Sequence, residues 1–265
     1  MDPLVSLKNI SIDTGSRRRW FRYRMSEEKL VDDVSFDIAP GQCFGLVGGE
    51  ASGKLPVTFA LLGLHQVSDG EIHFDGQSIE SMTRRKFHPL RKHIQAVFWD
   101  ELGQMNPRLT LDQAFRQVIR VWNVNADKFE ILSRIEKVMD SVKLPASTRY
   151  QTPLELDPAD RQLAAIARAL LPEPKFLIAH EVTRGLDVVE QAQILNRICD
   201  IRDDSNLSIM VVTDDLAVAE HMSDSIGVLH HGRLLETGPT NQIVMHPEHD
   251  YTRRLVGSTV TYFPS

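Results

Sequence analysis

The chain has 265 residues, of which 42% are hydrophobic and 25% charged, as is usual for a globular protein in water. Its net charge of −6 argues against nucleic acid as the main partner, and no apolar run approaches the length needed to cross a membrane. The N-terminus has no signal-peptide h-region, so any membrane role is expected to come through a partner. Cys43 and Cys199 lie far apart without metal-type spacing, which predicts reduced, buried thiols and a cytosolic location.

Two strand patterns open the chain, at residues 4–12 and 30–38. Between them, residues 16–24 are basic and aromatic. The favoured interpretation of this segment is a solvated hairpin insertion. The alternative is a contact with anionic lipid headgroups or with a partner protein.

A phosphate-binding loop is predicted after the apolar run at residues 43–47. A short strand, a glycine turn, a lysine and then a helical pattern at 55–64 form the context that makes such a loop credible. The spacing fits G-x-x-x-x-G-K, and the predicted nucleotide-binding residues are Gly48, Gly49, Glu50, Ala51, Ser52, Gly53 and Lys54. The serine or threonine that should follow the lysine and hold Mg²⁺ is instead Leu55, and Pro56 after it has no N–H.

The rest of the chain alternates between strand and helix patterns. Helical periodicity fills residues from about 110 to 170 and again near 188–202, and one amphipathic face is expected to be ordinary core: Ile131, Leu132, Ile135, Val138, Met139 and Val142. Strand patterns lie at 71–74, 94–98, 175–179, 208–213 and 226–229, the last leading into a turn at 231–233. This alternation predicts an α/β core with a helical subdomain.

The order of these landmarks resembles the ATP-binding subunits of ABC transporters over nearly the whole chain. The motifs that carry the resemblance are the phosphate loop and the segments 97–100, 165–170, 177–181, 184–187 and 212–216. The resemblance implies a RecA-like P-loop NTPase core with an antiparallel β subdomain and an inserted helical subdomain. It also implies a discontinuous core at 1–96 and 171–245, a helical subdomain at 97–170 and a C-terminal tail at 246–265.

Two further features resemble the oligopeptide/dipeptide-type import subfamily, namely Asn106-Pro107-Arg108 and the late motif at 246–253. Within that subfamily, the segment around Leu156 and the length of the chain resemble the Sap-type subunit associated with antimicrobial-peptide uptake.

Where the family holds Mg²⁺ with three side chains, this chain has Leu55, Trp99 and His180. An aliphatic chain cannot coordinate a hard cation, indole is only a donor, and neutral imidazole is a poor Mg²⁺ ligand, so we expect no metal site. The γ-phosphate-sensing histidine of the family is Asp214 here, whose carboxylate would repel the phosphate. The adenine-stacking aromatic aligns near Thr14, and the candidates to replace it are Trp20, Phe21 and Tyr23.

The signature loop of the family, Leu-Ser-Gly-Gly-Gln, is replaced by Leu156-Asp157-Pro158-Ala159-Asp160. Asp157 suits the N-cap of the following helix, Pro158 suits its first position and Asp160 its third, so this helix is predicted to cap itself rather than bind phosphate. The resemblance leaves Lys54 as an anion contact, Glu181 as a vestigial catalytic base and Asp187 as a dimer contact.

The favoured functional hypothesis is a degenerate, largely structural nucleotide-binding subunit of a peptide-type ABC transporter, with ATP as a candidate ligand, Mg²⁺ not expected and hydrolysis predicted to be weak or absent. It would pair as a heterodimer with a second ATP-binding subunit and dock on two permease subunits through the region around 99–120. A periplasmic substrate-binding protein would be an indirect partner, and the chain would lie at the cytoplasmic face of the bacterial inner membrane. The alternatives are an active ATPase subunit that powers peptide transport and a stand-alone regulator that binds nucleotide without Mg²⁺.

Overall fold

The computed structural model describes residues 2–14, 29–99, 103 and 105–259. Its contacts divide the chain into two compact units, of which the first joins Met1–His88 to Met210–Ser265 and the second is Pro89–Ile209. The basic and aromatic segment at 16–24 lies outside the described residues. The domain limits expected from the resemblance stay a prediction.

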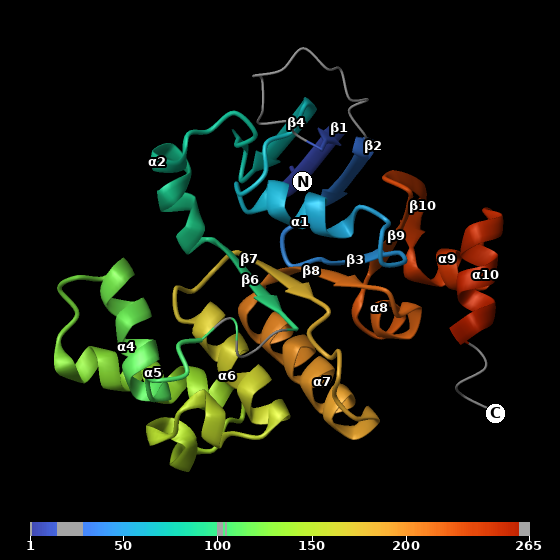
Figure 1. Cartoon of the computed structure of the whole chain (residues 1–265). Coiled ribbons are helices and arrows are strands. Elements are labelled where there is room, and N and C mark those ends of the chain that lie inside the picture. Colours follow the sequence, from blue (N-terminus) through green and yellow to red (C-terminus); the bar gives the residue numbers. More distant parts are fainter. Residues whose placement is uncertain (1, 15–28, 100–102, 104, 260–265) are drawn as a thin grey trace, which may run out of the picture. The chain divides into compact units, whose positions relative to one another are not determined.

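The first unit contains an antiparallel sheet in which neighbouring strands follow the order β2-β1-β4-β5, and Figure 1 labels the first three of these. Val5 of β1 lies opposite Ile38 of β2 on one side and opposite Phe74 of β4 on the other. These three side chains are buried, as the alternating sequence predicts for a sheet with one face on the core. The strands are β1 (Val5–Asp13), β2 (Lys29–Ile38), β4 (Asp69–Phe74) and β5 (Gln77–Ser78).

The same unit contains four strands that are neighbours in the order β10-β9-β3-β8, with β3 parallel to β9 and β10 antiparallel to β9. Every residue of β3 is buried, which its uninterrupted apolar sequence predicts for a strand inside a parallel sheet. The strands are β3 (Cys43–Val47), β8 (Ser208–Thr213), β9 (Ser225–His230) and β10 (Arg233–Pro239). The helices of this unit are α1 (Lys54–Leu61), α2 (Arg84–Phe87), α8 (Leu216–Met222), α9 (Thr240–Met245) and α10 (Asp250–Thr259).

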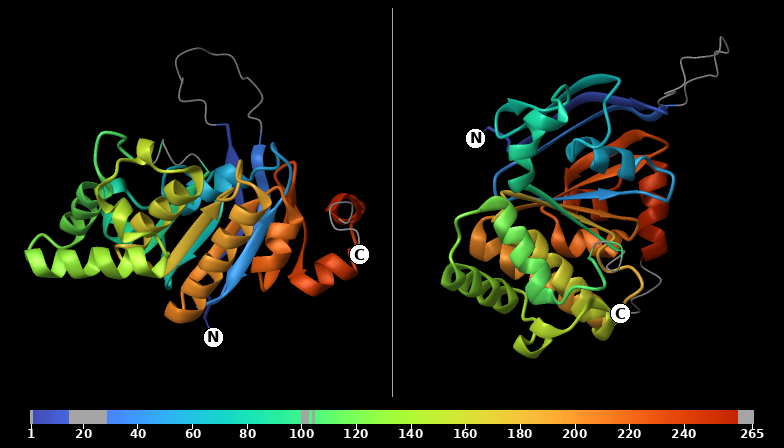
Figure 2. Two further views of the ribbon diagram at one scale, coloured as in Figure 1. Left: turned by 90° about the horizontal axis from the view of Figure 1, so that it is seen from below. Right: turned by 60° about the vertical axis from the view of Figure 1, so that its left-hand side comes forward.

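The second unit contains the parallel pair β6 (Ile94–Phe98) and β7 (Phe176–His180), in which Phe98 lies opposite His180. Helices α4, α5 and α6, drawn in green to yellow-green, gather at one side of this pair (Figure 2). The helices are α4 (Leu111–Trp122), α5 (Lys128–Ser141), α6 (Pro158–Leu170) and α7 (Val188–Ser205), with 3₁₀ turns at His88–Lys92, Ala146–Tyr150 and Pro153–Glu155.

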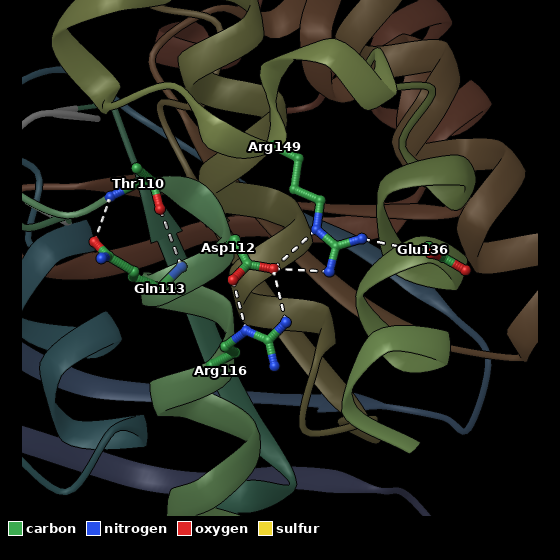
Figure 3. A network of polar contacts seen from close by, with 6 residues as sticks. All are labelled: Thr110, Asp112, Gln113, Arg116, Glu136 and Arg149. Carbon is green, nitrogen blue, oxygen red and sulfur yellow. Dashed lines mark hydrogen bonds and ion pairs between the residues drawn. The ribbon is translucent and has the colours of Figure 1, made fainter. Parts of the chain in front are cut away.

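A network of polar contacts fastens the helices of the second unit to one another (Figure 3). Asp112 on α4 accepts hydrogen bonds from Arg116, with Nε–Oδ2 at 2.5 Å, and from Arg149, with Nε–Oδ1 at 2.8 Å. Arg149 also forms an ion pair with Glu136 of α5 at 3.4 Å. Burial acts to raise the pKa of Asp112, but the bonds from the two arginines outweigh it and hold that pKa below its ordinary value.

The α/β fold class expected from the alternation is confirmed, and the predicted strands and helices are found within a few residues of their limits. The apolar face of α5 is buried as expected, apart from the partly exposed Leu132. The prediction of two buried thiols is wrong for Cys199, because this residue is partly exposed on α7, whereas Cys43 is buried in β3. Among the described residues, no helix has both the length and the apolar character required to cross a bilayer.

Candidate functional site

The phosphate loop follows β3 directly and is held by backbone hydrogen bonds at both ends. Gly48 N donates to Thr213 O of β8 at 3.3 Å, and Ser52 N closes a turn onto Gly49 O at 3.1 Å. Val57 N donates to Gly53 O at 3.2 Å and so begins α1 immediately after the loop. The strand, loop and helix expected from the sequence are therefore formed.

Two glycines of the loop are required by their surroundings. A Cβ on Gly48 would lie 2.1 Å from the backbone oxygen of Leu229, so no side chain fits there without moving the backbone. Gly53 has φ 104°, in the left-handed region, and its Cβ would lie 2.7 Å from Leu30 O. The loop thus has a backbone shape that depends on glycine at both positions.

Lys54 turns inward at the start of α1 and is only 5% exposed. Its ammonium group donates to the backbone oxygens of Gly48 and Gly49, the latter at 3.1 Å. This burial excludes a simple surface lysine at the start of a helix. The role of Lys54 in binding an anion remains a prediction.

The first turn of α1 offers no hydroxyl at the position that should hold Mg²⁺. The side chain of Leu55 is 41% exposed there. Thr58, one turn further along α1, is fully buried and donates its hydroxyl to Lys54 O at 3.0 Å. The exposed end of this helix therefore presents an alkyl group.

Two other predicted positions lie in the same unit as the loop. Asp214 follows β8 and is exposed, next to Thr213, whose carbonyl holds Gly48. Thr14 is exposed directly after β1 ends at Asp13. Trp20, Phe21 and Tyr23, the candidates for stacking on a base, are outside the described part of the chain.

In the second unit, the carboxyl ends of β6 and β7 carry aromatic side chains where the family has Mg²⁺ ligands. His180 at the end of β7 is 9% exposed, and its ring centroid lies 5.4 Å from that of Phe98. Trp99 after β6 is 48% exposed, and the guanidinium carbon of Arg184 lies 5.5 Å from the centroid of its ring. This separation is that of a cation–π contact between the two strand ends.

Glu181 and Asp187 are the residues of this unit that match the residue types of the family's motifs, and their surroundings differ. Glu181 is partly exposed, has φ 51° and accepts a backbone bond from Arg184 N at 3.0 Å. Asp187 is the N-cap of α7, where its carboxylate accepts from Val189 N at 2.8 Å and from Glu190 N at 2.9 Å. The Asp187 side chain thus has a local structural role in the capping of α7.

The segment that replaces the signature loop is used to start α6. Asp157 is the N-cap and accepts from Asp160 N at 2.7 Å, with Pro158 at the first helical position. Burial raises the pKa of Asp160, and the charge of Asp157 raises it further. The predicted self-capping is confirmed, and its two carboxylates occupy the N-terminal end where an anion would otherwise be favoured.

These residues do not fit Mg²⁺. The three expected ligand positions carry an exposed alkyl group at Leu55, an indole in contact with Arg184 at Trp99, and a buried imidazole beside Phe98 at His180. Hard divalent cations require oxygen ligands, and none of these side chains supplies one. Within the described ranges, no cluster of three or more histidine, cysteine, aspartate or glutamate side chains could hold a metal ion.

Two contributors to these regions were missed by sequence reasoning. Arg184 lay in a recognised motif, but the motif carried no indication that its guanidinium contacts Trp99. Tyr251 lay in the late motif at 246–253 that marks the import subfamily. In the structure its hydroxyl oxygen accepts a hydrogen bond from Gly49 N of the phosphate loop at 3.2 Å.

Comparison with known proteins agrees with this architecture. Residues 31–184 match the family model described as ABC transporter. The chain is 32% identical to a putative peptide import ATP-binding protein of Brucella ovis, over 97% of this chain and 78% of that protein. It is also 32% identical to an oligopeptide transport ATP-binding protein of Streptococcus mutans, over 96% of this chain and 81% of the relative.

A solved structure shows the same fold. The cbiO1 protein from Clostridium perfringens, part of the ABC transporter complex cbiONQ, superposes with a TM-score of 0.80 at 20% sequence identity, covering 99% of this chain and 96% of that one. The family match covers more than half of the chain, and the two relatives extend it to nearly the whole length. The chain therefore belongs to the ABC transporter family.

Proposed function

We propose that this protein is a nucleotide-binding subunit of a peptide-type ABC importer and does not hydrolyse ATP by the ordinary Mg²⁺-dependent route. The observation that carries the proposal is that none of the three side chains at the Mg²⁺ positions, Leu55, Trp99 and His180, can supply an oxygen ligand. Glu181 keeps the place of the base, but a base has little to act on without a held γ-phosphate.

Binding of a nucleotide is supported by the phosphate loop itself. Its required glycines and its buried lysine keep the backbone shape of an anion-binding turn. These features act through backbone N–H groups and one fixed ammonium, and neither needs a metal ion. ATP is therefore the proposed ligand, bound without an essential Mg²⁺.

The proposed partners are a second ATP-binding subunit, two permease subunits and, indirectly, a periplasmic substrate-binding protein. Peptide import is supported by the names of the two relatives at 32% identity. The proposed permease contact around 99–120 rests on the resemblance to the family. The protein would then lie at the cytoplasmic face of the bacterial inner membrane.

The proposed heterodimer is supported by substitutions in both units. ABC subunits pair head to tail, so a subunit whose α6 begins with Asp157 and Asp160 would impair the site of its partner, and Leu55 would impair its own. The Sap-type assignment within the import subfamily rests on the segment around Leu156.

The alternative function is an active ATPase subunit, favoured by the retained Lys54 and Glu181. Steady-state ATP turnover by the purified protein with Mg²⁺ separates the two proposals, with Lys54→Ala as the control for contaminating ATPases. We expect equal, background turnover for both proteins. ATP turnover by the wild-type protein that disappears in Lys54→Ala would refute the proposal that the subunit is inactive.

A matched gain-of-function variant sharpens this test. Leu55→Ser, His180→Asp and Asp214→His together return oxygen ligands and a γ-phosphate contact to the chain. If the site has decayed, the triple variant should gain affinity for Mg²⁺–ATP, measured by calorimetry. A loss of affinity would show instead that the present side chains serve a working site.

A further inference from the structure

We propose that Tyr251 on the C-terminal helix α10 is a positioning residue of the phosphate loop. Its hydroxyl fixes the first turn of the loop in the shape that receives an anion, and this contact makes α10 respond to the state of the loop. The inference rests on the proposed function only where the anion is taken to be a nucleotide.

The central contact joins residues 202 positions apart in the sequence. Gly49 N donates to Tyr251 Oη at 3.2 Å. A Cβ built on Gly49 would lie 3.5 Å from the same oxygen, an ordinary van der Waals distance, so the phenol lies directly against this part of the loop. The phenol therefore satisfies a loop N–H that would otherwise need water.

The Tyr251 ring is itself held in place by stacking. It lies on the ring of His230, with centroids 3.9 Å apart and an interplanar angle of 23°. His230 in turn contacts His231 at 4.1 Å. Burial lowers the pKa of His230, and the charges of His231, Arg254 and His249 lower it further, so a neutral imidazole stacks on the phenol at neutral pH.

The start of α10 is anchored to β10 independently of the loop. The carboxylate of Glu236 accepts from Glu248 N at 2.8 Å and from His249 N at 3.1 Å. His249 Nδ1 accepts from Tyr251 N at 3.1 Å, which fixes the first turn of the helix. The phenol is thus attached to a segment that the sheet already holds.

The apolar face of α10 packs beside the root of the loop. Tyr251, Leu255 and Val256 lie against a buried cluster that includes Val47 and Val228. Val47 is the residue directly before Gly48. A shift of the loop can therefore reach α10 by two routes, the hydrogen bond at Gly49 and the apolar cluster to which Val47 belongs.

The test compares Tyr251→Phe with the wild-type protein, using Tyr150→Phe as the matched control. Phenylalanine keeps the stack on His230 and removes only the hydroxyl. Tyr150 is 70% exposed and lies in the second unit, so the same substitution there leaves the loop alone. Amide hydrogen exchange in the nucleotide-free protein is measured for the peptide that contains Gly49.

We expect exchange at Gly49 to be about tenfold faster in Tyr251→Phe, the size expected when a typical hydrogen bond is lost. The melting temperature and the exchange of the second unit should match those of Tyr150→Phe. Unchanged exchange at Gly49, or a uniform increase over the whole chain, would overturn the positioning role. This arm needs no nucleotide, so it stands even if the proposed function fails.

A second arm tests whether α10 responds to the loop. Lys54→Ala removes the ammonium that holds Gly48 and Gly49, and it should speed exchange across residues 250–259 in the nucleotide-free protein. In Tyr251→Phe the same substitution should have a smaller effect on α10. If Lys54→Ala in the wild-type background leaves the amide exchange of α10 unchanged, the proposed coupling is overturned.

A binding measurement completes the test. If the loop is positioned in advance by Tyr251, ATP affinity in the presence of EDTA should fall about fivefold in Tyr251→Phe and stay unchanged in Tyr150→Phe. An unchanged affinity with faster Gly49 exchange would contradict the claim that the held shape is the binding shape. Absence of ATP binding to the wild-type protein would count against the proposed function and leave the exchange result intact.

Discussion

The phosphate loop and the strand ends of the second unit have been preserved in different ways. The loop keeps its strand, its two required glycines and an inward lysine, which are the features on which the proposed anion site rests. At the ends of β6 and β7 and at the start of α6, the fold is kept while the side chains make contacts of their own. Trp99 meets Arg184, and Asp157 caps its helix.

The difference follows from how each region would bind a nucleotide. Backbone N–H groups bind phosphate through shape, and shape is fixed by glycine positions and packing. Holding Mg²⁺ and sensing a γ-phosphate need particular side chains at particular places. A chain can lose the second set and still retain the first, and this separation can be tested one region at a time.

Gly48→Ala should produce the largest effect, because its Cβ would lie 2.1 Å from Leu229 O and displace the loop. We expect ATP affinity to fall by about 100-fold or more, measured by calorimetry. Gly257→Ala is the control, since its Cβ would meet nothing within 4 Å. Equal ATP affinities for the two variants would show that ATP binding does not depend on the shape of the loop.

Asp112→Ala should destabilise the second unit by about 3 kcal/mol, because it leaves the nearly buried guanidinium of Arg149 without its main partner. Urea unfolding followed by hydrogen exchange in each unit measures the loss. The paired replacement of Asp112 by Leu and Arg149 by Met should recover much of it. Faster exchange at Gly49 in Asp112→Ala would contradict the independence of the two regions.

Asp157→Ala should cost about 1 kcal/mol, the usual cost of losing an N-cap, and Asp157→Ser should restore most of it. Chemical denaturation measures both variants. ATP affinity of the isolated protein should not change in either, because this carboxylate is assigned a structural role. A large gain in affinity for Asp157→Ala would indicate instead that it repels phosphate within the same chain.

Asp160 gives the smallest predicted effect, and it depends on pH. Its folded-state pKa is raised, so the folded state binds the proton more tightly than the unfolded state. The stabilisation from this group is full below the unfolded pKa of about 3.8 and is lost as pH rises through the folded value. Asp160→Asn should therefore be slightly more stable than the wild type at pH 7, and the advantage should vanish near pH 3.

Denaturation curves of the two proteins at several pH values check this prediction. An advantage for Asp160→Asn that grows as pH falls would contradict the assigned sign. Asp157→Asn should reproduce part of the gain at pH 7, because the charge of Asp157 is one cause of the raised pKa.

The elements of the fold could be predicted because each has a local signal. The uninterrupted apolar run of β3 predicted a buried strand, and Asp157-Pro158 with Asp160 predicted the self-capped start of α6. The phosphate loop was visible because its glycines and lysine have a fixed spacing. Each of these signals is carried by residues that are only a few positions apart in the sequence.

The contacts that could not be predicted join residues that are distant in the sequence. Tyr251 and Gly49 are 202 positions apart, and Arg149 and Asp112 are 37 apart. Such pairs depend on how several elements pack together, and no periodicity or spacing within one segment predicts that packing. The contact between the late motif at 246–253 and the phosphate loop is therefore visible only in the structure.

The most direct test of the account is the affinity of the purified protein for ATP with Mg²⁺ and with EDTA, measured by isothermal titration calorimetry. A loop that binds through its backbone and Lys54 without Mg²⁺ predicts measurable affinity that is lost in Lys54→Ala and that differs less than about threefold between the two conditions. Affinity that rises tenfold or more with Mg²⁺ would contradict the claim that the metal-dependent part of the site has been lost.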